Sequence, residues 1–326
     1  MPVPVPGSPA EAQARPLPGL PDTLRVMSRG WLSSNQVVFT AEGCDTAVVD
    51  TGHVREVQAT LALTAQALAG RPLQRIVNTH LHSDHAGGNA ALQAAHPGVR
   101  VSIPPGLAEA VQQWDEVALS YRDTDQTCPR FLHDDTLPLQ GHVQLGGWPW
   151  QVLPADGHDR HMVMLWCEPL GVLISADALW QQGFGVLFPE LAGEPGAFEA
   201  QWATLDTIER LQPRWVIPGH GDPFCTVGEA IAGARSRLQW LAEDPSRHAQ
   251  VALKGLVAFG LMERGQMPLA GVTRLIGQGL MAQPGFARWF DEPAQTLAER
   301  VMAQLVRAGV AREIGPETWG TVDARP

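Results

Sequence analysis

The sequence predicts an α/β protein with a helical C-terminal part, and three observations carry this prediction. Short apolar runs bounded by Gly and Pro recur between residues 23 and 217, as expected for strands of a sheet. Segments with apolar residues at helical spacing lie between these runs. After about residue 245 the chain changes to three helical segments and a short terminal hairpin. At 326 residues the chain can bury a large core and exceeds one domain of typical size.

The first half of the chain is predicted to begin with strands and then to alternate helices with strands. Gly43 and Asp45 mark a hairpin between two early strands, and Gly70 closes the first helix as a C-terminal glycine. Strands are expected at residues 23–28, 36–41, 46–50, 73–78 and 99–103, and helices at residues 55–68, 88–95 and 107–119.

The next part of the chain is richer in strands. They are expected at residues 143–145, 148–153, 162–166, 172–174 and 215–217, with a helix at residues 197–211. Two strand-rich halves with helices outside them suggest layers of sheet and helix packed around a common core.

Three parts are predicted along the chain: a Pro-rich arm over residues 1–22, an α/β domain over residues 23–244, and a helical domain over residues 245–326. The last part has helical patterns at residues 246–263, 270–280 and 293–309 and ends in a hairpin, which resembles a winged-helix module. Its third helix carries Arg300 and Arg307 but no basic stripe. We therefore expect it to cover the site or to join two copies of the chain as a homodimer, not to bind DNA.

A cluster of metal-ligand residue types follows the strand expected at residues 73–78. His80, His82, Asp84 and His85 stand within six positions, and a pair of glycines then lets the chain turn sharply into a helix. Side chains that alternate off a strand end and the following turn can point to one place. Imidazoles and a carboxylate at one place are the ligands expected for zinc or a similar divalent ion.

This spacing, H-x-H-x-D-H, resembles the signature of the metallo-β-lactamase superfamily, and further segments follow the order of that family. Asp50 ends a strand before the motif. His158 follows Gly157 in a turn, Asp177 ends a strand, and His220 stands in a Pro-Gly-His turn. The resemblance covers roughly the first 240 residues. It implies the four-layer αβ/βα metallo-β-lactamase sandwich, to which some members add a winged-helix-like C-terminal domain.

The resemblance also implies a site for two divalent ions, with zinc as the first choice and iron or manganese as alternatives. Each ion would have three ligands of its own, and one carboxylate would bridge the two ions. The implied ligands are His80, His82 and His158 for one ion, Asp84, His85 and His220 for the other, and Asp177 as the bridge. Asp50 is expected to orient a ligand histidine through the second nitrogen of its ring. Asp84 and Asp177 are the residues expected to act in catalysis.

Two bound ions would lower the pKa of a water molecule toward about 7 and so supply a hydroxide that attacks a carbonyl carbon. Hydrolysis of an ester, thioester or lactone, as in glyoxalase II and the lactonases, is the function that the resemblance favours. A phosphodiesterase or ribonuclease of the same fold is one alternative. A member that senses a ligand without catalysis is another.

Four residues near the implied ligands are expected to face the substrate. Arg160 and His161 follow His158 directly, and Arg160 could bind a carboxylate or phosphate. Trp180 and Phe184 follow the bridging aspartate and would wall the pocket, together with residues 104–140. His161 is also a rival of His158 as a metal ligand. His158 is preferred because it stands in the expected turn, whereas His161 begins the next strand.

The net charge and the cysteine content of the chain indicate which classes of molecule it can bind and in which compartment it would occur. The formal net charge of −11 argues against a nucleic-acid surface, and Lys254 is the only lysine among 23 basic residues. Four scattered cysteines fit a reducing cytoplasm. No signal-peptide pattern or membrane-length apolar run occurs in this sequence. We therefore expect a cytoplasmic bacterial protein that acts on a small molecule, without nucleic acid or membrane as a partner.

Overall fold

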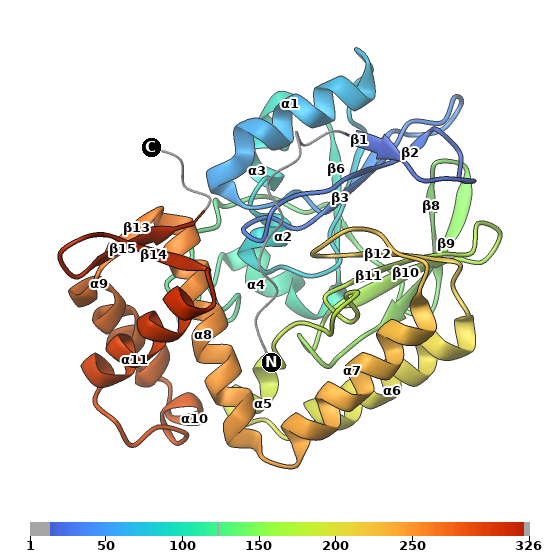
Figure 1. Ribbon diagram of the computed structural model, residues 1–326. Helices are drawn as coiled ribbons and strands as arrows, with labels where there is room; N and C mark the ends of the chain where they lie inside the picture. The colour runs from blue at the N-terminus through green and yellow to red at the C-terminus, as the bar shows by residue number, and fades with distance from the viewer. Residues whose placement is uncertain (1–13, 123, 323–326) are drawn as a thin grey trace.

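The computed structural model describes residues 14–122 and 124–322 and has the four-layer architecture predicted from the sequence (Figure 1). Two β-sheets pack face to face, and helices cover the outer face of each sheet. The first sheet has the strand order β1-β2-β3-β4-β5-β6-β7, and the second has the order β12-β11-β10-β9-β8. The predicted fold class is thus confirmed, including the helical C-terminal region.

The first sheet is antiparallel from β1 to β4 and parallel from β4 to β7. Its strands are β1 (Ala14–Pro16), β2 (Leu24–Met27), β3 (Gln36–Phe39), β4 (Ala47–Val49), β5 (Arg75–Val77), β6 (Arg100–Ile103) and β7 (Asp135–Thr136). Parallel neighbours require crossover connections, and these contain α1 (Val57–Leu68), α2 (Ser83–Ala86), α3 (Asn89–Ala95) and α4 (Ala108–Gln113). Because β4 and β5 are parallel, the segments that follow them meet at one edge of the sheet.

The second sheet is antiparallel except for the parallel pair β11 and β12. Its strands are β8 (His142–Leu145), β9 (Trp148–Pro154), β10 (Val163–Cys167), β11 (Val172–Ala176) and β12 (Trp215–Pro218). The helices α6 (Ala197–Leu211) and α7 (Val227–Ala242) pack on its outer face, and the short α5 (Phe188–Ala192) precedes them. The parallel pairing brings the carboxyl ends of β11 and β12 to the same edge.

The main core lies between the two sheets. Phe39 of the first sheet meets Trp150 of the second edge to face, with ring centroids 5.4 Å apart. Every residue of β10 and β11 is buried, because one face of the sheet packs on this core and the other on α6 and α7. Burial on both faces explains why the sequence of these strands is a continuous apolar run and does not alternate.

The C-terminal region is helical and ends in a hairpin, as predicted, with the short α10 and the strand β13 in addition to the three predicted helices (Figure 1). Its elements are α8 (Pro245–Arg264), β13 (Gln266–Pro268), α9 (Leu269–Arg274), α10 (Pro284–Ala287), α11 (Ala294–Arg307), β14 (Ala311–Gly315) and β15 (Thr318–Thr321). The region has its own core, in which Leu253, Ile276 and Val301 are fully buried. Asp244 caps α8 by accepting a hydrogen bond from the Ser246 N–H, so α8 begins where the predicted domain boundary lies.

One end of α8 is fixed to the α/β part of the chain. Glu263 lies 3.6 Å from the ring nitrogen Nε2 of His53 and accepts a hydrogen bond from the backbone of Thr127. Arg264 pairs with Asp125 at 2.6 Å. These contacts hold α8 across the edge of the sandwich at which the strand ends gather.

Some elements differ from the sequence prediction. The helix expected at residues 107–119 ends at Gln113, because Trp114 adopts the left-handed conformation with φ of 58°. The sequence pattern does not indicate α7, whose Gly228 and Gly233 weaken the helical signal. Of the predicted N-terminal arm, residues 1–13 lie outside the described residues, and Ala14–Pro16 form the edge strand β1. In the part of the chain that is described, no helix has both the length and the apolarity to cross a membrane.

Candidate metal centre

The seven residues predicted as ligands gather at one edge of the sandwich. Each follows the carboxyl end of a strand: four come after β5 and one each after β9, β11 and β12. They form three overlapping groups whose ligand-type atoms lie within 4.8 Å of one another, namely His80 with His82 and His158, His80 with His85 and Asp177, and Asp84 with His85 and His220. The structure thus brings together every residue of the implied ligand set.

The first histidine triad has the spacing of metal ligands. Nε2 of His80 lies 3.1 Å from Nδ1 of His82, and Nε2 of His158 lies 2.9 Å from the same atom. Tetrahedral zinc with bonds of about 2.0–2.1 Å would place its nitrogen ligands about 3.3 Å apart. Three ring nitrogens that converge in this way present lone pairs to one point, which fits a bound cation.

The second group lies on the other side of Asp177. Nε2 of His220 is 3.0 Å from a carboxylate oxygen of Asp84, and Nε2 of His85 is 3.6 Å from Oδ1 of Asp177. The other oxygen of Asp177 lies 3.4 Å from Nε2 of His158. This carboxylate therefore touches both groups. Nε2 of His85 is buried and makes no hydrogen bond within the described residues, as expected of a nitrogen reserved for a metal ion.

The charges of the cluster suit cation binding. Burial, followed by the neighbouring histidines, holds the pKa of His80 well below its usual range, and burial lowers the pKa of His158 to about 4. Burial would raise the pKa of Asp177, but His220 and His85 outweigh it and hold that pKa well below its ordinary value. Burial would lower the pKa of His85 as well, but the carboxylates of Asp177, Asp50 and Asp84 outweigh it and hold that pKa well above its usual range. The ionised carboxylates and the neutral His80 and His158 are in the protonation states that a metal ion requires, whereas His85 would exchange a proton for the ion.

Asp50 lies behind the cluster, as expected. Its Oδ2 is 2.9 Å from Nδ1 of His85, and the same carboxylate accepts hydrogen bonds from the backbone N–H and the hydroxyl of Thr79. His158 uses a different acceptor, because its Nδ1 donates to the carbonyl of Val186 at 2.6 Å. Asp50 is thus the partner of His85 and not of His158. Each contact fixes one ring and leaves its Nε2 for the cluster.

A glycine is required in the turn that carries His220. A Cβ atom on Gly219 would collide with Oδ1 of Asp177 and lie 3.0 Å from Cε1 of His85. The backbone of this turn therefore passes between two predicted ligands, where any side chain would displace them. This close approach explains the Pro-Gly-His sequence of the turn.

The family model of the metallo-beta-lactamase superfamily matches residues 29–220, which is more than half of the chain. The chain belongs to the metallo-beta-lactamase superfamily. The matched range includes all seven residues of the cluster, and the family implies bound divalent metal ions. The resemblance that the motifs indicate in the sequence is therefore confirmed.

Curated relatives of this superfamily domain include several hydroxyacylglutathione hydrolases. The one from Anaeromyxobacter dehalogenans is 31% identical over 226 residues, which cover 68% of this chain and 76% of the relative. The one from Erythrobacter litoralis is 27% identical over 208 residues, covering 64% and 66%. The matches thus span about two thirds to three quarters of these relatives' lengths. The prediction of an enzyme of the hydrolase class agrees with the names of both.

Solved structures with the same fold include a beta-lactamase domain protein from Burkholderia ambifaria, with a TM-score of 0.53 and 20% identity over 97% of both chains. A metallo-beta-lactamase family protein from Thermus thermophilus has a TM-score of 0.51 and 18% identity, covering 94% of this chain and 97% of that one. At these identities the likeness concerns the fold alone. It extends over nearly the whole chain and so includes the C-terminal region of this superfamily member.

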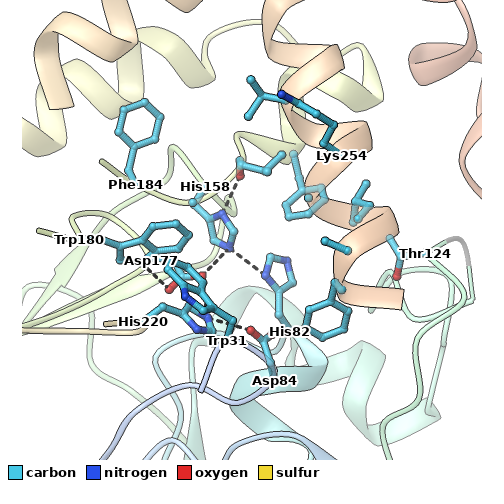
Figure 2. A pocket seen from close by; sticks show the side chains of 18 of the residues that line it. Trp31, His82, Asp84, Thr124, His158, Asp177, Trp180, Phe184, His220 and Lys254 are labelled. Carbon is cyan, nitrogen blue, oxygen red and sulfur yellow. Dashed lines mark hydrogen bonds and ion pairs between the residues drawn. The ribbon is translucent and has the colours of Figure 1, made fainter. Parts of the chain in front are cut away.

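A cavity of about 550 Å³ opens beside the metal centre (Figure 2). Trp180 and Phe184 line it, as predicted from the sequence. The segment 104–140 contributes only polar residues around Thr124, whereas α8 contributes an apolar wall that includes Phe259 and Met262. The C-terminal region of this superfamily member thus forms one side of the pocket.

Arg160 and His161 are not among the residues that line this cavity. The Arg160 guanidinium pairs with Glu194 at 2.5 Å, and His161 is exposed in a turn where its backbone N–H donates to Asp159. Both side chains are exposed in the turn after His158. Their contact with the substrate stays a prediction, and His161 does not belong to any group of potential metal ligands among the described residues.

Two tryptophans pack beside His220. Trp31 stacks on its ring with a centroid distance of 5.4 Å and an interplanar angle of 4°, and Trp180 meets Trp31 edge to face at 5.2 Å. Nε1 of Trp180 donates a hydrogen bond to Oδ1 of Asp177 at 3.1 Å. Sequence reasoning misses Trp31, because a lone Trp in a loop far upstream of His80 has no motif around it.

We expect Trp180→Phe to lower kcat about 10-fold, or metal affinity by the same factor, while the fold is retained. Phe keeps the aromatic contact with Trp31 but removes the N–H that orients the Asp177 carboxylate. Steady-state kinetics and metal analysis of the purified variant measure the effect. Trp148→Phe at the start of β9 is a matched control. Equal behaviour of the two variants would show that the hydrogen bond has no role.

Proposed function

We propose that this chain is a dinuclear metal-dependent hydrolase that cleaves a carbonyl ester bond, with thioesters as the first choice and lactones or oxygen esters next. The observation that carries the proposal is the convergence of two ligand groups and a shared carboxylate at the base of a largely apolar pocket. The relatives named hydroxyacylglutathione hydrolase favour a thioester.

The distances within the cluster support the ligand assignment that the family resemblance implies. One ion would be held by three imidazoles and the other by two imidazoles and a carboxylate, with a second carboxylate between them. In full, these are His80, His82 and His158; Asp84, His85 and His220; and Asp177. When bound, the ions would supply a nucleophile at neutral pH and a Lewis acid for the carbonyl oxygen. An imidazole-rich set suits zinc best, and iron or manganese would also fit.

The residues around the cluster have separate tasks in this proposal. Asp50 and the Val186 carbonyl hold two histidine rings in place, and Trp180 orients the shared carboxylate. The aromatic walls would accept the apolar part of an acyl group and exclude bulk water from the scissile bond. The α8 helix would act as a cap, which is the role we assign to residues 245–326.

A substrate panel tests the proposal. The zinc-loaded protein should hydrolyse acyl thioesters and aliphatic lactones with kcat/KM of about 10⁴ M⁻¹s⁻¹ or more for a good substrate, and bis(p-nitrophenyl) phosphate far more slowly. A preference for the phosphodiester would favour the phosphodiesterase or ribonuclease alternative. Full metal loading without turnover of any compound would favour a ligand-sensing protein. The cytoplasmic location, the dimer and the lack of nucleic-acid binding stay predictions.

A further inference from the structure

Two positively charged side chains line the pocket in addition to the residues of the metal centre. Apart from histidines, the charged side chains that line the cavity are Asp84, Asp177, Arg237 and Lys254. The two aspartates belong to the ligand cluster, so the rest of the lining has only positive charge. Arg237 comes from α7 and Lys254 from α8, two consecutive helices that both line the pocket.

Neither cation has an anionic partner. Among the described residues, no carboxylate oxygen lies within 4.0 Å of Arg237 or Lys254, and neither side chain makes a hydrogen bond. Arg237 instead lies over the ring of Phe184, with Cζ 5.6 Å from the ring centroid. Arg235, two positions away on the same helix, shows the usual arrangement on this acidic protein, because it pairs with Asp206 at 2.6 Å.

The cations stand away from the metal centre. Figure 2 shows Lys254 at the end of the pocket opposite Asp84 and His220, with its side chain extending from α8 toward the side where Phe184 lies. Apolar side chains, including those of Phe188, Phe259 and Leu256, line the cavity as well. A ligand that fills the pocket therefore meets the metal ligands at one end and positive charge at the other.

From this arrangement we infer that the substrate is an amphipathic anion. Its scissile carbonyl would lie at the metal centre, its apolar middle part against the aromatic walls, and a carboxylate, sulfonate or phosphate group between Arg237 and Lys254. The placement of the carbonyl group at the metal centre rests on the proposed hydrolase function. The placement of the anionic group rests only on Arg237 and Lys254, which have no anionic partner.

The energetics favour an anion at this place. A half-buried charge without a partner loses hydration and recovers little, and an anionic group on the ligand would restore that loss through charge-assisted hydrogen bonds. Burial lowers the pKa of Arg237, and burial followed by the charge of Arg237 lowers the pKa of Lys254. The effect of Arg237 on the pKa of Lys254 agrees with two positive charges that no anion neutralises. The net charge of −11 repels anions at long range, so their binding depends on a local positive site.

A matched pair of substrates tests the inference. The p-nitrophenyl monoester of octanedioic acid has a free carboxylate at its far end, and the same compound with a methyl ester there has none. The zinc-loaded wild type should cleave the free acid with a KM about 10-fold lower than that of the capped compound. Lys254→Met and Arg237→Met should each remove most of this preference. In each variant the KM for the free acid should therefore approach the KM for the capped compound.

Two controls separate charge from shape. Lys254→Arg should restore the preference, because it keeps the charge on a side chain of similar length. Arg210→Met removes an exposed cation of α6 whose only described hydrogen-bond partner is Thr207, and it should change nothing. Equal KM values for the two esters in the wild type would overturn the inference. A preference that survives in both methionine variants would overturn it as well.

Chemical modification of Lys254 gives a second test that does not depend on ester cleavage. Failure to cleave either ester would count against the hydrolase proposal but would leave this second test intact. Lys254 is the only lysine, so mass spectrometry can follow its modification by an amine-reactive reagent without interference from other lysines. Octanesulfonate should slow this modification about 10-fold or more, and 1-octanol should not. Loss of this protection in Arg237→Met would show that the anion binds at the site formed by Arg237 and Lys254. Equal protection by the two compounds would reject the anionic site independently of activity.

Discussion

Asp177→Ala is expected to lower kcat/KM by at least about 10²-fold and to release at least one of two metal equivalents. Asp177 is the one carboxylate that touches both ligand groups, at 3.4 Å from Nε2 of His158 and 3.6 Å from Nε2 of His85. Its removal leaves each group one ligand short and takes away the negative charge that lies between the two groups. Elemental analysis and steady-state kinetics on the same preparation measure both effects.

The control for this variant is Asp206→Ala on the outer face of α6, where Asp206 pairs with Arg235 in contact with solvent. This surface pair contributes little to stability, so metal content and activity should stay at the wild-type level. Two full equivalents of metal in Asp177→Ala would contradict the bridging role. Loss of metal with full activity would contradict the catalytic one.

Removal of the metal should abolish the hydrolase activity and lower the thermal stability of the protein. Without ions the ring nitrogen Nε2 of His85 is buried and unpaired among the described residues, and Nδ1 of His82 lies 3.1 Å and 2.9 Å from the nitrogens of His80 and His158. An ion that binds only the folded state, at a free concentration of about 100 times its Kd, stabilises that state by about 2.7 kcal/mol. Chelation, followed by calorimetry and a thioester assay, measures both losses.

Adding metal ions back to the metal-free protein should reverse the loss of activity. Zinc, iron or manganese added back should restore activity, and the best of them should saturate near two equivalents per chain. Saturation at one equivalent would leave a mononuclear site as the better description. Activity that persists in protein shown to be free of transition metals would remove the metal-dependent mechanism.

Much of this architecture could be predicted from the sequence, because its signals are local. The motif histidines and Asp84 lie within six positions of one another and directly follow an apolar strand, so their convergence needs only the geometry of one strand end and one turn. His158, Asp177 and His220 each follow a strand in the same way, and the family order links them to the motif. A change from strand-like runs to helical periodicity is visible in the sequence near residue 245, where α8 begins.

Contacts between distant segments could not be predicted, because no local pattern encodes them. Arg160 and His161 stand beside a ligand in the sequence, yet both are exposed, and Glu194 pairs with the arginine. Trp31 reaches His220 across the two halves of the sandwich.

The fold class, the local metal-binding motif and the order of the C-terminal elements can be read from the amino-acid order, since each depends on neighbours along the chain. The surroundings of the site depend instead on how the chain packs in three dimensions. Lys254 stands in the sequence as a compositional curiosity, and Arg237 as one of many arginines. Packing of α8 across the edge of the sandwich places both residues in the lining of one pocket, because burial of apolar faces, and not sequence distance, sets which helices meet.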